Sequence, residues 1–163
     1  MAAEPSRIEW AVRAPAGPQL FGQSWRPGGS PRAAVLVVHG LAEHSGRYVA
    51  VARALTEASL DVHAVDYRGH GRSEGRRVHV DSVRDYVADV RAALAEVRRL
   101  SPGLPVFLLG HSQGGLIALE LALDEPAAVD GIVVTSPFLA THRDARPSGP
   151  VRATAAVLRR LAP

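Results

Sequence analysis

The chain has 163 residues, of which 47% are hydrophobic and 21% charged, enough apolar side chain for one domain with a buried core, so global disorder is excluded. It contains no cysteine, which excludes disulfides, thiolate nucleophiles and cysteine-ligated zinc. The formal net charge is only +3, and all of the basic residues are arginines scattered along the chain. This composition is typical of a high-GC bacterial genome and differs from a nucleic-acid-binding surface, in which basic and aromatic residues interleave.

No apolar stretch reaches the roughly 18–20 residues that a membrane helix requires. The first ten residues, MAAEPSRIEW, also lack the apolar core of a secretion signal. We therefore expect a cytoplasmic protein without a transmembrane segment.

The first 66 residues alternate short apolar segments with turn-forming sequences. Residues 33–38, AAVLVV, are a continuous apolar run of the kind found in parallel strands that are covered on both faces. The pattern predicts strands at 8–14, 19–25, 33–38 and 60–66, and a helix at 45–58.

Residues 81–100 form the clearest predicted helix, because their apolar positions recur at intervals of three and four. Asp81 is the expected N-cap, and Ser101-Pro102-Gly103 should end the helix. The remaining predicted elements are a strand at 106–109, a helix at 114–123 and a strand at 132–135. This alternation predicts an α/β fold: a mostly parallel sheet with helices on both faces, preceded by an antiparallel pair.

The strongest chemical signal is the sequence Gly110-His111-Ser112-Gln113-Gly114, a G-x-S-x-G motif. An apolar strand is expected to lead into it and a helix to follow it, which is the context of a nucleophile elbow. In such an elbow, Gly110 and Gly114 leave room for a tight turn, and Ser112 adopts a strained backbone conformation with its hydroxyl exposed. The alternative is an ordinary Gly/Ser turn.

The second signal, HGLAEHSGRY at residues 39–48, follows the first buried strand. Acyl transfer requires main-chain N–H groups directed at the oxyanion of the tetrahedral intermediate. We expect these donors to be Leu41, in this loop, and Gln113, next to the nucleophile. His39, Glu43 and His44 do not have the spacing of a helical zinc site, so we assign them structural roles and predict no metal.

The third signal, DYRGHGRSEG at residues 66–75, is rich in glycine. Its glycine spacing differs from that of a dinucleotide-binding loop, and the absence of lysine excludes a Walker A loop. We interpret this segment as a turn held by Asp–Arg and Ser contacts.

These three motifs, in this order and spacing, resemble the monoacylglycerol lipase and lysophospholipase group of the α/β-hydrolase superfamily, also called serine aminopeptidase S33-like. The resemblance extends from about residue 10 to residue 137. It implies an α/β-hydrolase fold with an eight-stranded sheet, a Ser–Asp–His triad and a cap over the acyl pocket. It also implies a reaction that needs no metal or organic cofactor. It also implies that Ser112 is the nucleophile and that Leu41 and Gln113 are the oxyanion donors, whereas His111 has no catalytic role.

The resemblance divides the chain into an N-terminal portion of the hydrolase core, residues 1–137, and a linker with the start of the cap, residues 138–163. Arg152, Arg159 and Arg160 share one face of a predicted helix at 151–161, which is either a membrane-surface helix or the first piece of the cap. Peripheral membrane contact is expected only through this region.

In this superfamily, the triad acid and histidine follow the nucleophile along the chain. None of the acidic residues or histidines downstream of Ser112 matches a triad position; they are Asp124, Glu125, Asp130, His142 and Asp144. We therefore expect the acid and the base beyond residue 163, and a sheet that stops before the last strands. An apolar edge strand left open in this way predicts that the chain alone self-associates.

The sequence thus predicts a serine hydrolase that cleaves esters of acyl glycerols, lysophospholipids or similar small lipids through an acyl-enzyme on Ser112. Two alternatives remain open. One is an inactive hydrolase-fold fragment that acts at most as a binding protein, and the other is the same chemistry on an aminoacyl amide or a thioester. No nucleic-acid partner is expected.

Overall fold

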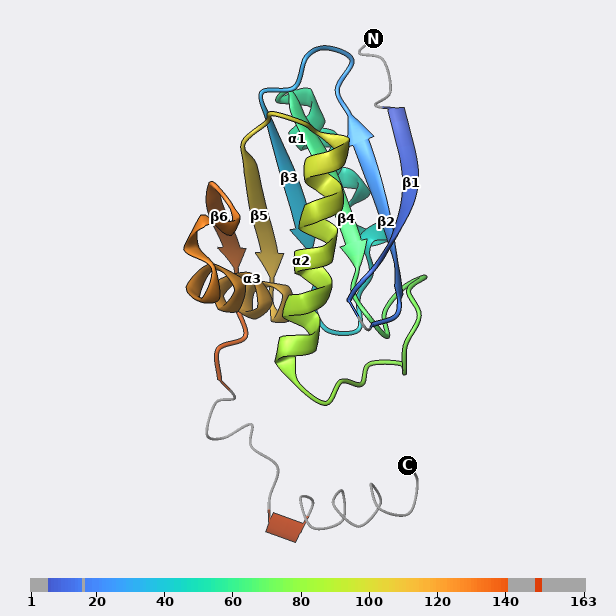
Figure 1. Cartoon of the computed structure of the whole chain (residues 1–163), viewed down its shortest axis with the longest axis vertical. Coiled ribbons are helices and arrows are strands. Elements are labelled where there is room, and N and C mark those ends of the chain that lie inside the picture. Colours follow the sequence, from blue (N-terminus) through green and yellow to red (C-terminus); the bar gives the residue numbers. More distant parts are fainter. Residues whose placement is uncertain (1–5, 16, 141–148, 151–163) are drawn as a thin grey trace.

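The computed structural model of the chain describes residues 6–15, 17–140 and 149–150 and contains one mixed six-stranded sheet (Figure 1). The strands are β1 (Ser6–Arg13), β2 (Gln19–Arg26), β3 (Ala33–Val38), β4 (Leu60–Asp66), β5 (Val106–His111) and β6 (Gly131–Thr135). Their order in the sheet is β1-β2-β4-β3-β5-β6. The pairs β1–β2 and β2–β4 are antiparallel, and the pairs among β4, β3, β5 and β6 are parallel. The expected parallel sheet with its antiparallel lead-in is confirmed.

Helices cover both faces of the sheet, as expected (Figure 1). The described helices are α1 (Val49–Glu57), α2 (Val83–Leu100) and α3 (Gln113–Asp124), with short 3₁₀ turns η1 (Ser45–Tyr48) and η2 (Pro126–Ala128). Because side chains alternate along a strand, Leu36 of β3 packs in the core with α2 and α3, whereas Val35 and Val37 pack with Ala52 of α1 on the other face. This two-sided burial explains why β3 has no polar residue.

The start of α2 differs from the prediction, because its N-cap is Ser82 and not Asp81. Ser82 is extended, and its side chain accepts a hydrogen bond from the Arg84 N–H at 3.2 Å. The Asp81 side chain is instead 97% exposed. Serine caps a helix as well as aspartate does. The choice between two neighbouring cap residues therefore depends on which side-chain oxygen the preceding loop places at the first turn of the helix.

The turn at residues 66–75 is held by Asp66 and Ser73. The Asp66 carboxylate accepts hydrogen bonds from the Ser45 N–H at 2.6 Å and the Arg72 N–H at 2.9 Å. Ser73 donates to the Asp66 carbonyl and accepts from the Phe21 N–H at 2.8 Å. The predicted Asp–Arg contact is therefore formed with the main chain of Arg72, and the turn is anchored to both β2 and η1.

Arg68 fastens the same turn to α2. Its main-chain N–H and its guanidinium all donate to the Asp89 carboxylate, at 2.8–2.9 Å, and the Asp89 side chain is fully buried. These hydrogen bonds satisfy a buried carboxylate that would otherwise be costly. The segment that follows β4 is thus fixed against its neighbours.

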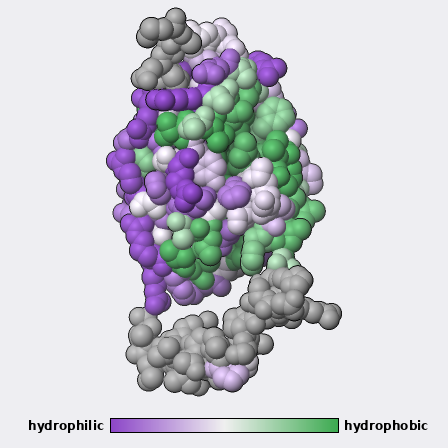
Figure 2. Space-filling model, turned by 180° about the vertical axis from the view of Figure 1, so that it is seen from behind, coloured by the Kyte–Doolittle hydropathy of each residue, from purple (hydrophilic) through white to green (hydrophobic). Residues whose placement is uncertain are grey.

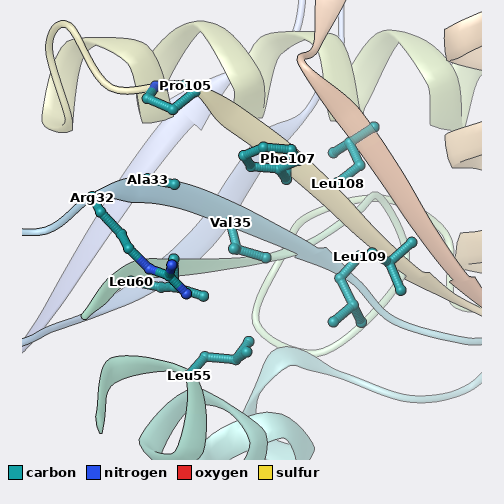
Figure 3. Close-up of a pocket in the computed structure, with 10 residues that line it drawn as sticks. Arg32, Ala33, Val35, Leu55, Leu60, Pro105, Phe107, Leu108 and Leu109 are labelled. Atoms are coloured by element: carbon teal, nitrogen blue, oxygen red, sulfur yellow. The ribbon is translucent and has the colours of Figure 1, made fainter. Parts of the chain in front are cut away.

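One face of the sheet is open beside α1. Figure 2 shows this face, because it is turned by 180° from the view of Figure 1. Hydrophobic residues lie along its right-hand side, which is the side of the edge strand β6. A groove of about 450 Å³ lies here, and Leu55 of α1 faces Val35 and Phe107 of the sheet across it (Figure 3). Val133 of β6 also lines the groove and is 53% exposed.

We expect this face to cause self-association of the chain, because β6 pairs only with β5 among the described strands and exposes an apolar edge. Val133→Lys should reduce the association, since a charge at an edge strand opposes pairing with another chain. Light scattering at increasing protein concentration measures the effect. Ile8→Lys, at the opposite edge strand β1, is the matched control and should change little. A monodisperse monomer of the unmodified chain would contradict the prediction.

Candidate functional site

Ser112 lies between the end of β5 and the start of α3, where the chain changes from strand to helix. Its backbone angles are φ 52° and ψ −116°, a region that residues other than glycine rarely occupy. The Ser112 N–H donates to the Thr135 carbonyl of β6 at 3.0 Å. The strained conformation expected of a nucleophile elbow is therefore present.

Gly110 and Gly114 make this turn possible. A Cβ at Gly110 would lie 2.5 Å from the Gly114 carbonyl oxygen. A Cβ at Gly114 would lie 2.6 Å from the Val38 carbonyl carbon and closer still to its oxygen. Real Cβ atoms do not approach other atoms below 3.0 Å. Both glycines thus leave the space that a tight turn of this kind requires, and Gly114 lets α3 begin directly against the end of β3.

The loop after β3 lies beside the elbow. A Cβ at Gly40 would be 3.3 Å from the Ser112 Cβ, so the main chain at this point passes the serine directly. The Gly40 N–H donates to the Glu43 carboxylate at 3.0 Å. This hydrogen bond ties the loop into a turn, and the next residue, Leu41, is 53% exposed.

The direction of the Leu41 N–H follows from the contacts of the Gly40 carbonyl. In a trans peptide unit the C=O and the N–H point in opposite directions, and here both belong to the unit that joins Gly40 to Leu41. The Gly40 oxygen lies 3.0 Å from the Tyr67 hydroxyl, 2.8 Å from His39 Nδ1 and 3.3 Å from the Glu43 N–H. These contacts hold the Gly40 carbonyl on one side of the peptide unit and so direct the Leu41 N–H to the opposite side.

The same argument applies to Gln113. The Ser112 carbonyl, which shares a peptide unit with the Gln113 N–H, accepts from the N–H groups of Gly115, Leu116 and Phe138 at 3.0–3.2 Å. Neither the Leu41 nor the Gln113 N–H donates to a partner within the described part of the chain. Two oriented donors without a partner, one of them at the N-terminus of a helix, form an arrangement that can stabilise negative charge beside Ser112.

Glu43 supports this loop as an ionised carboxylate. Burial raises its pKa, but the hydrogen bonds from the Gly40 N–H and the Tyr48 hydroxyl, together with the Arg47 charge, outweigh burial and lower the pKa. Within the described residues there is no group of three side chains able to hold a metal ion. The structural role assigned to Glu43 agrees with these contacts.

His39 is almost fully buried and stacks on the Tyr67 ring, with 4.1 Å between ring centroids. Its pKa is lowered to about 4, chiefly by burial and to a smaller extent by the neighbouring His70, whereas the hydrogen bond to Gly40 and the charges of Asp66 and Glu43 act in the opposite direction. His39 is therefore neutral in the folded protein at pH 7 and packs as an aromatic ring.

This lowered pKa predicts that the free energy of unfolding falls as the pH decreases from 6.5 to about 4. In that window His39 binds a proton in the unfolded chain but not in the folded protein. The free energy of unfolding should therefore be about 3 kcal/mol lower near pH 4 than above pH 6.5. Urea titrations between pH 7.5 and 4.5 measure the slope. His39→Gln should flatten it, and His44→Gln, at an exposed position, should not. An unchanged slope in His39→Gln would show that other groups carry the pH dependence.

No described histidine or carboxylate forms a hydrogen bond with the Ser112 hydroxyl. His111 instead pairs through Nδ1 with the Thr135 hydroxyl at 2.9 Å. Asp124 and Glu125 pair with arginines of α2, and Asp130 accepts from the Val106 N–H at the opposite end of β5. His142, Asp144, the linker that contains them and the predicted helix at 151–161 lie outside the described residues.

Tyr67 is the site residue that sequence reasoning missed. It follows β4 directly, and β4 is paired in parallel with β3, so both strands end at the same edge of the sheet. The carboxyl ends of parallel strands are where sites form in open α/β sheets. That rule could have selected Tyr67 from the sequence, once β3 and β4 had been recognised as neighbours.

Comparison with known proteins places these motifs in a known family. The family model "Serine aminopeptidase, S33" matches residues 29–163. Among curated proteins, the monoglyceride lipase of Homo sapiens is 46% identical over 123 residues, which cover 76% of this chain and 41% of that protein. The monoacylglycerol lipase of Mycolicibacterium smegmatis is 37% identical over 158 residues, 97% of this chain and 56% of that protein. The chain thus spans about half the length of these curated relatives.

Solved structures are similar in fold as well. The monoacylglycerol lipase of Paleococcus ferrophilus superposes with a TM-score of 0.66 at 33% identity, over 99% of this chain and 53% of that one. A thermostable carboxyl esterase from Bacillus coagulans, solved with glycerol, gives a TM-score of 0.72 at 28% identity, over 79% of this chain and 44% of that one. Each match covers about half of the solved chain, as with the curated relatives.

Proposed function

Because the chain belongs to the serine aminopeptidase S33 family of α/β-hydrolases, we propose that it forms the nucleophile half of a serine hydrolase that cleaves carboxylic esters of small lipids. The observation that carries the proposal is the strained Ser112 beside two main-chain N–H groups, those of Leu41 and Gln113, that have no partner among the described residues. Strain at a serine beside main-chain N–H groups that can stabilise an anion is characteristic of a nucleophile, whereas an ordinary turn needs neither feature.

In the proposed reaction, Ser112 Oγ bonds to the ester carbonyl carbon while its proton passes to a base. The N–H groups of Leu41 and Gln113 stabilise the oxyanion. The carbon–oxygen bond to the alcohol then breaks, and the alcohol leaves with that proton. Water repeats the sequence on the acyl-enzyme, releases the fatty acid and restores Ser112. No metal or organic cofactor takes part.

The base and its acid are proposed to lie outside residues 1–163. Support comes from the partners of the downstream described groups, since Asp124, Glu125 and Asp130 are all engaged in other contacts. A serine hydroxyl without a base is a weak nucleophile, so the complete site requires this second half. In the same scheme, residues 1–137 form part of the hydrolase core and residues 138–163 begin the cap.

We propose monoacylglycerols as the substrate class, with lysophospholipids second, because the relatives cited above are named monoglyceride or monoacylglycerol lipases. No helix among the described residues is both long and apolar enough to cross a membrane. We propose action in the cytoplasm, with contact to a membrane surface through the cap.

The test is the intact mass of the protein from its native source, before and after reaction with a fluorophosphonate. A mass above 17.3 kDa and one adduct per chain at Ser112 are expected, together with hydrolysis of a monoacylglycerol. A mass of 17.3 kDa without an adduct would overturn the proposal in favour of an inactive binding protein. Faster turnover of an aminoacyl anilide or a thioester than of any lipid ester would keep Ser112 as nucleophile and overturn the substrate class.

A further inference from the structure

Tyr67 connects the two segments that carry the Leu41 and Gln113 N–H groups. Its side chain is fully buried at the end of β4. Its hydroxyl oxygen lies 3.0 Å from the Gly40 carbonyl oxygen, in the loop after β3, and 3.1 Å from the Gln113 side-chain amide oxygen, at the start of α3. One oxygen atom therefore contacts both of the segments that carry these N–H groups.

The hydroxyl has one proton and can donate it to one acceptor at a time. The Gly40 carbonyl is the nearest acceptor, and the His39 carbonyl is farther away at 3.3 Å. A half-turn of the Gln113 amide brings its NH₂ group to the position of its oxygen, so that Gln113 donates to Tyr67 while Tyr67 donates to Gly40. This arrangement satisfies the buried hydroxyl as donor and as acceptor.

The contact at Gly40 has a direct effect on the direction of the Leu41 N–H. Because the Gly40 carbonyl and the Leu41 N–H belong to one planar peptide unit, a group that holds the carbonyl also directs the N–H. Burial, followed by the nearby Tyr86 and the Glu43 charge, raises the pKa of Tyr67, so the hydroxyl remains a donor across the working pH range.

We propose that the Tyr67 hydroxyl is a positioning group of the oxyanion hole. By holding the Gly40 carbonyl, it keeps the Leu41 N–H directed at the same oxyanion as the Gln113 N–H. This inference rests on the proposed function for its catalytic consequence, but its structural part stands on the contacts alone. It predicts that the loss of one oxygen atom, in a protein that folds normally, weakens stabilisation of the transition state and leaves substrate binding unchanged.

The ring and the hydroxyl of Tyr67 can be separated experimentally. The ring packs against His39, His70 and Tyr86, with centroid distances of 4.1, 4.4 and 4.8 Å. Tyr67→Phe keeps this packing and removes only the hydroxyl. Tyr86→Phe is the matched control, because Tyr86 belongs to the same aromatic cluster, whereas the Gly40 carbonyl is held by Tyr67, His39 and the Glu43 N–H.

The first measurement is hydrogen exchange on the full chain, followed by mass spectrometry of peptides that contain residues 39–44 and 112–116. Tyr67→Phe should raise exchange in the 39–44 peptide by about tenfold, and Tyr86→Phe should not. The second is ester hydrolysis by the native protein. Since loss of a whole oxyanion donor costs about 10²–10³ in kcat, loss of its positioning group should lower kcat by about tenfold, with KM within about twofold. Inhibition by a trifluoromethyl ketone, which forms a tetrahedral adduct, should weaken by a similar factor.

Wild-type exchange and wild-type kcat in Tyr67→Phe would overturn the proposal. If Tyr67→Phe does not fold, Gln113→Met tests the proposal instead. This variant keeps the main-chain N–H of residue 113 and removes the side-chain amide that contacts the Tyr67 hydroxyl, the link between the two segments. Raised exchange in the 112–116 peptide then supports the link, and unchanged exchange overturns it. An unmodified protein that hydrolyses no ester would overturn the proposed function alone, since the exchange result still decides whether Tyr67 holds the loop.

Discussion

Replacing Ser112 by alanine should abolish the fluorophosphonate adduct and lower ester hydrolysis by about 10⁶-fold, which is the scale of loss when the nucleophile of a serine hydrolase is removed. The oxyanion donors belong to the main chain and remain, so a small residual rate over water is expected. Labelling followed by peptide mapping, with hydrolysis of a monoacylglycerol in parallel, measures both effects. An adduct on another serine, or a loss of less than tenfold, would remove Ser112 from the role of nucleophile.

The same position gives a second and independent expectation for stability. Ser112 has a φ of 52°, which costs a residue with a Cβ on the order of 1–3 kcal/mol and costs glycine almost nothing. Ser112→Gly should therefore unfold at higher urea concentration than Ser112→Ala, by about 1 kcal/mol in the free energy of unfolding. Both variants lack the hydroxyl, so the difference isolates backbone strain. Equal stability of the two variants would show that the turn is not strained.

Gly114→Ala should destabilise the protein by about 3 kcal/mol and also impair the site, because overpacking against main-chain atoms cannot be relieved by a change of rotamer. The added Cβ would lie 2.6 Å from the Val38 carbonyl carbon, so either α3 or the end of β3 must move. The loop after β3 carries Leu41, and the movement therefore also changes the distance between the two N–H donors. Urea denaturation and the rate of fluorophosphonate labelling measure the two consequences.

Gly28→Ala is the matched control for this substitution. Gly28 is exposed, and a Cβ added there would meet no atom within 4 Å. The variant should be as stable as the unmodified chain or gain up to about 1 kcal/mol, because alanine restricts the unfolded chain. A Gly114→Ala protein as stable as Gly28→Ala would contradict the close approach of α3 and β3.

The sequence by itself determined the elements and the identity of the candidate nucleophile. The apolar run at residues 33–38 is the strand β3 with the predicted bounds, since near-continuous apolar runs are typical of parallel strands covered on both faces. Ser112 could be selected for a similar local reason. A G-x-S-x-G motif between an apolar strand and a helix predicts a strained strand-to-helix turn, and Ser112 has such a conformation.

Only the tertiary structure decided how the segments around Ser112 are held together. Glu43, Tyr67 and Ser112 come from three segments far apart in the chain, and they meet because β3, β4 and β5 end at the same edge of the sheet. The motif at residues 66–75 contains Tyr67 but does not indicate its role, since that role depends on a carbonyl 27 residues away. The cap of α2 was decided in the same way, because the loop before the helix places the Ser82 oxygen at the first turn and leaves Asp81 in solvent. Local periodicity and motif spacing determine elements, whereas contacts between distant segments depend on how the strands are ordered, which a single sequence does not encode locally.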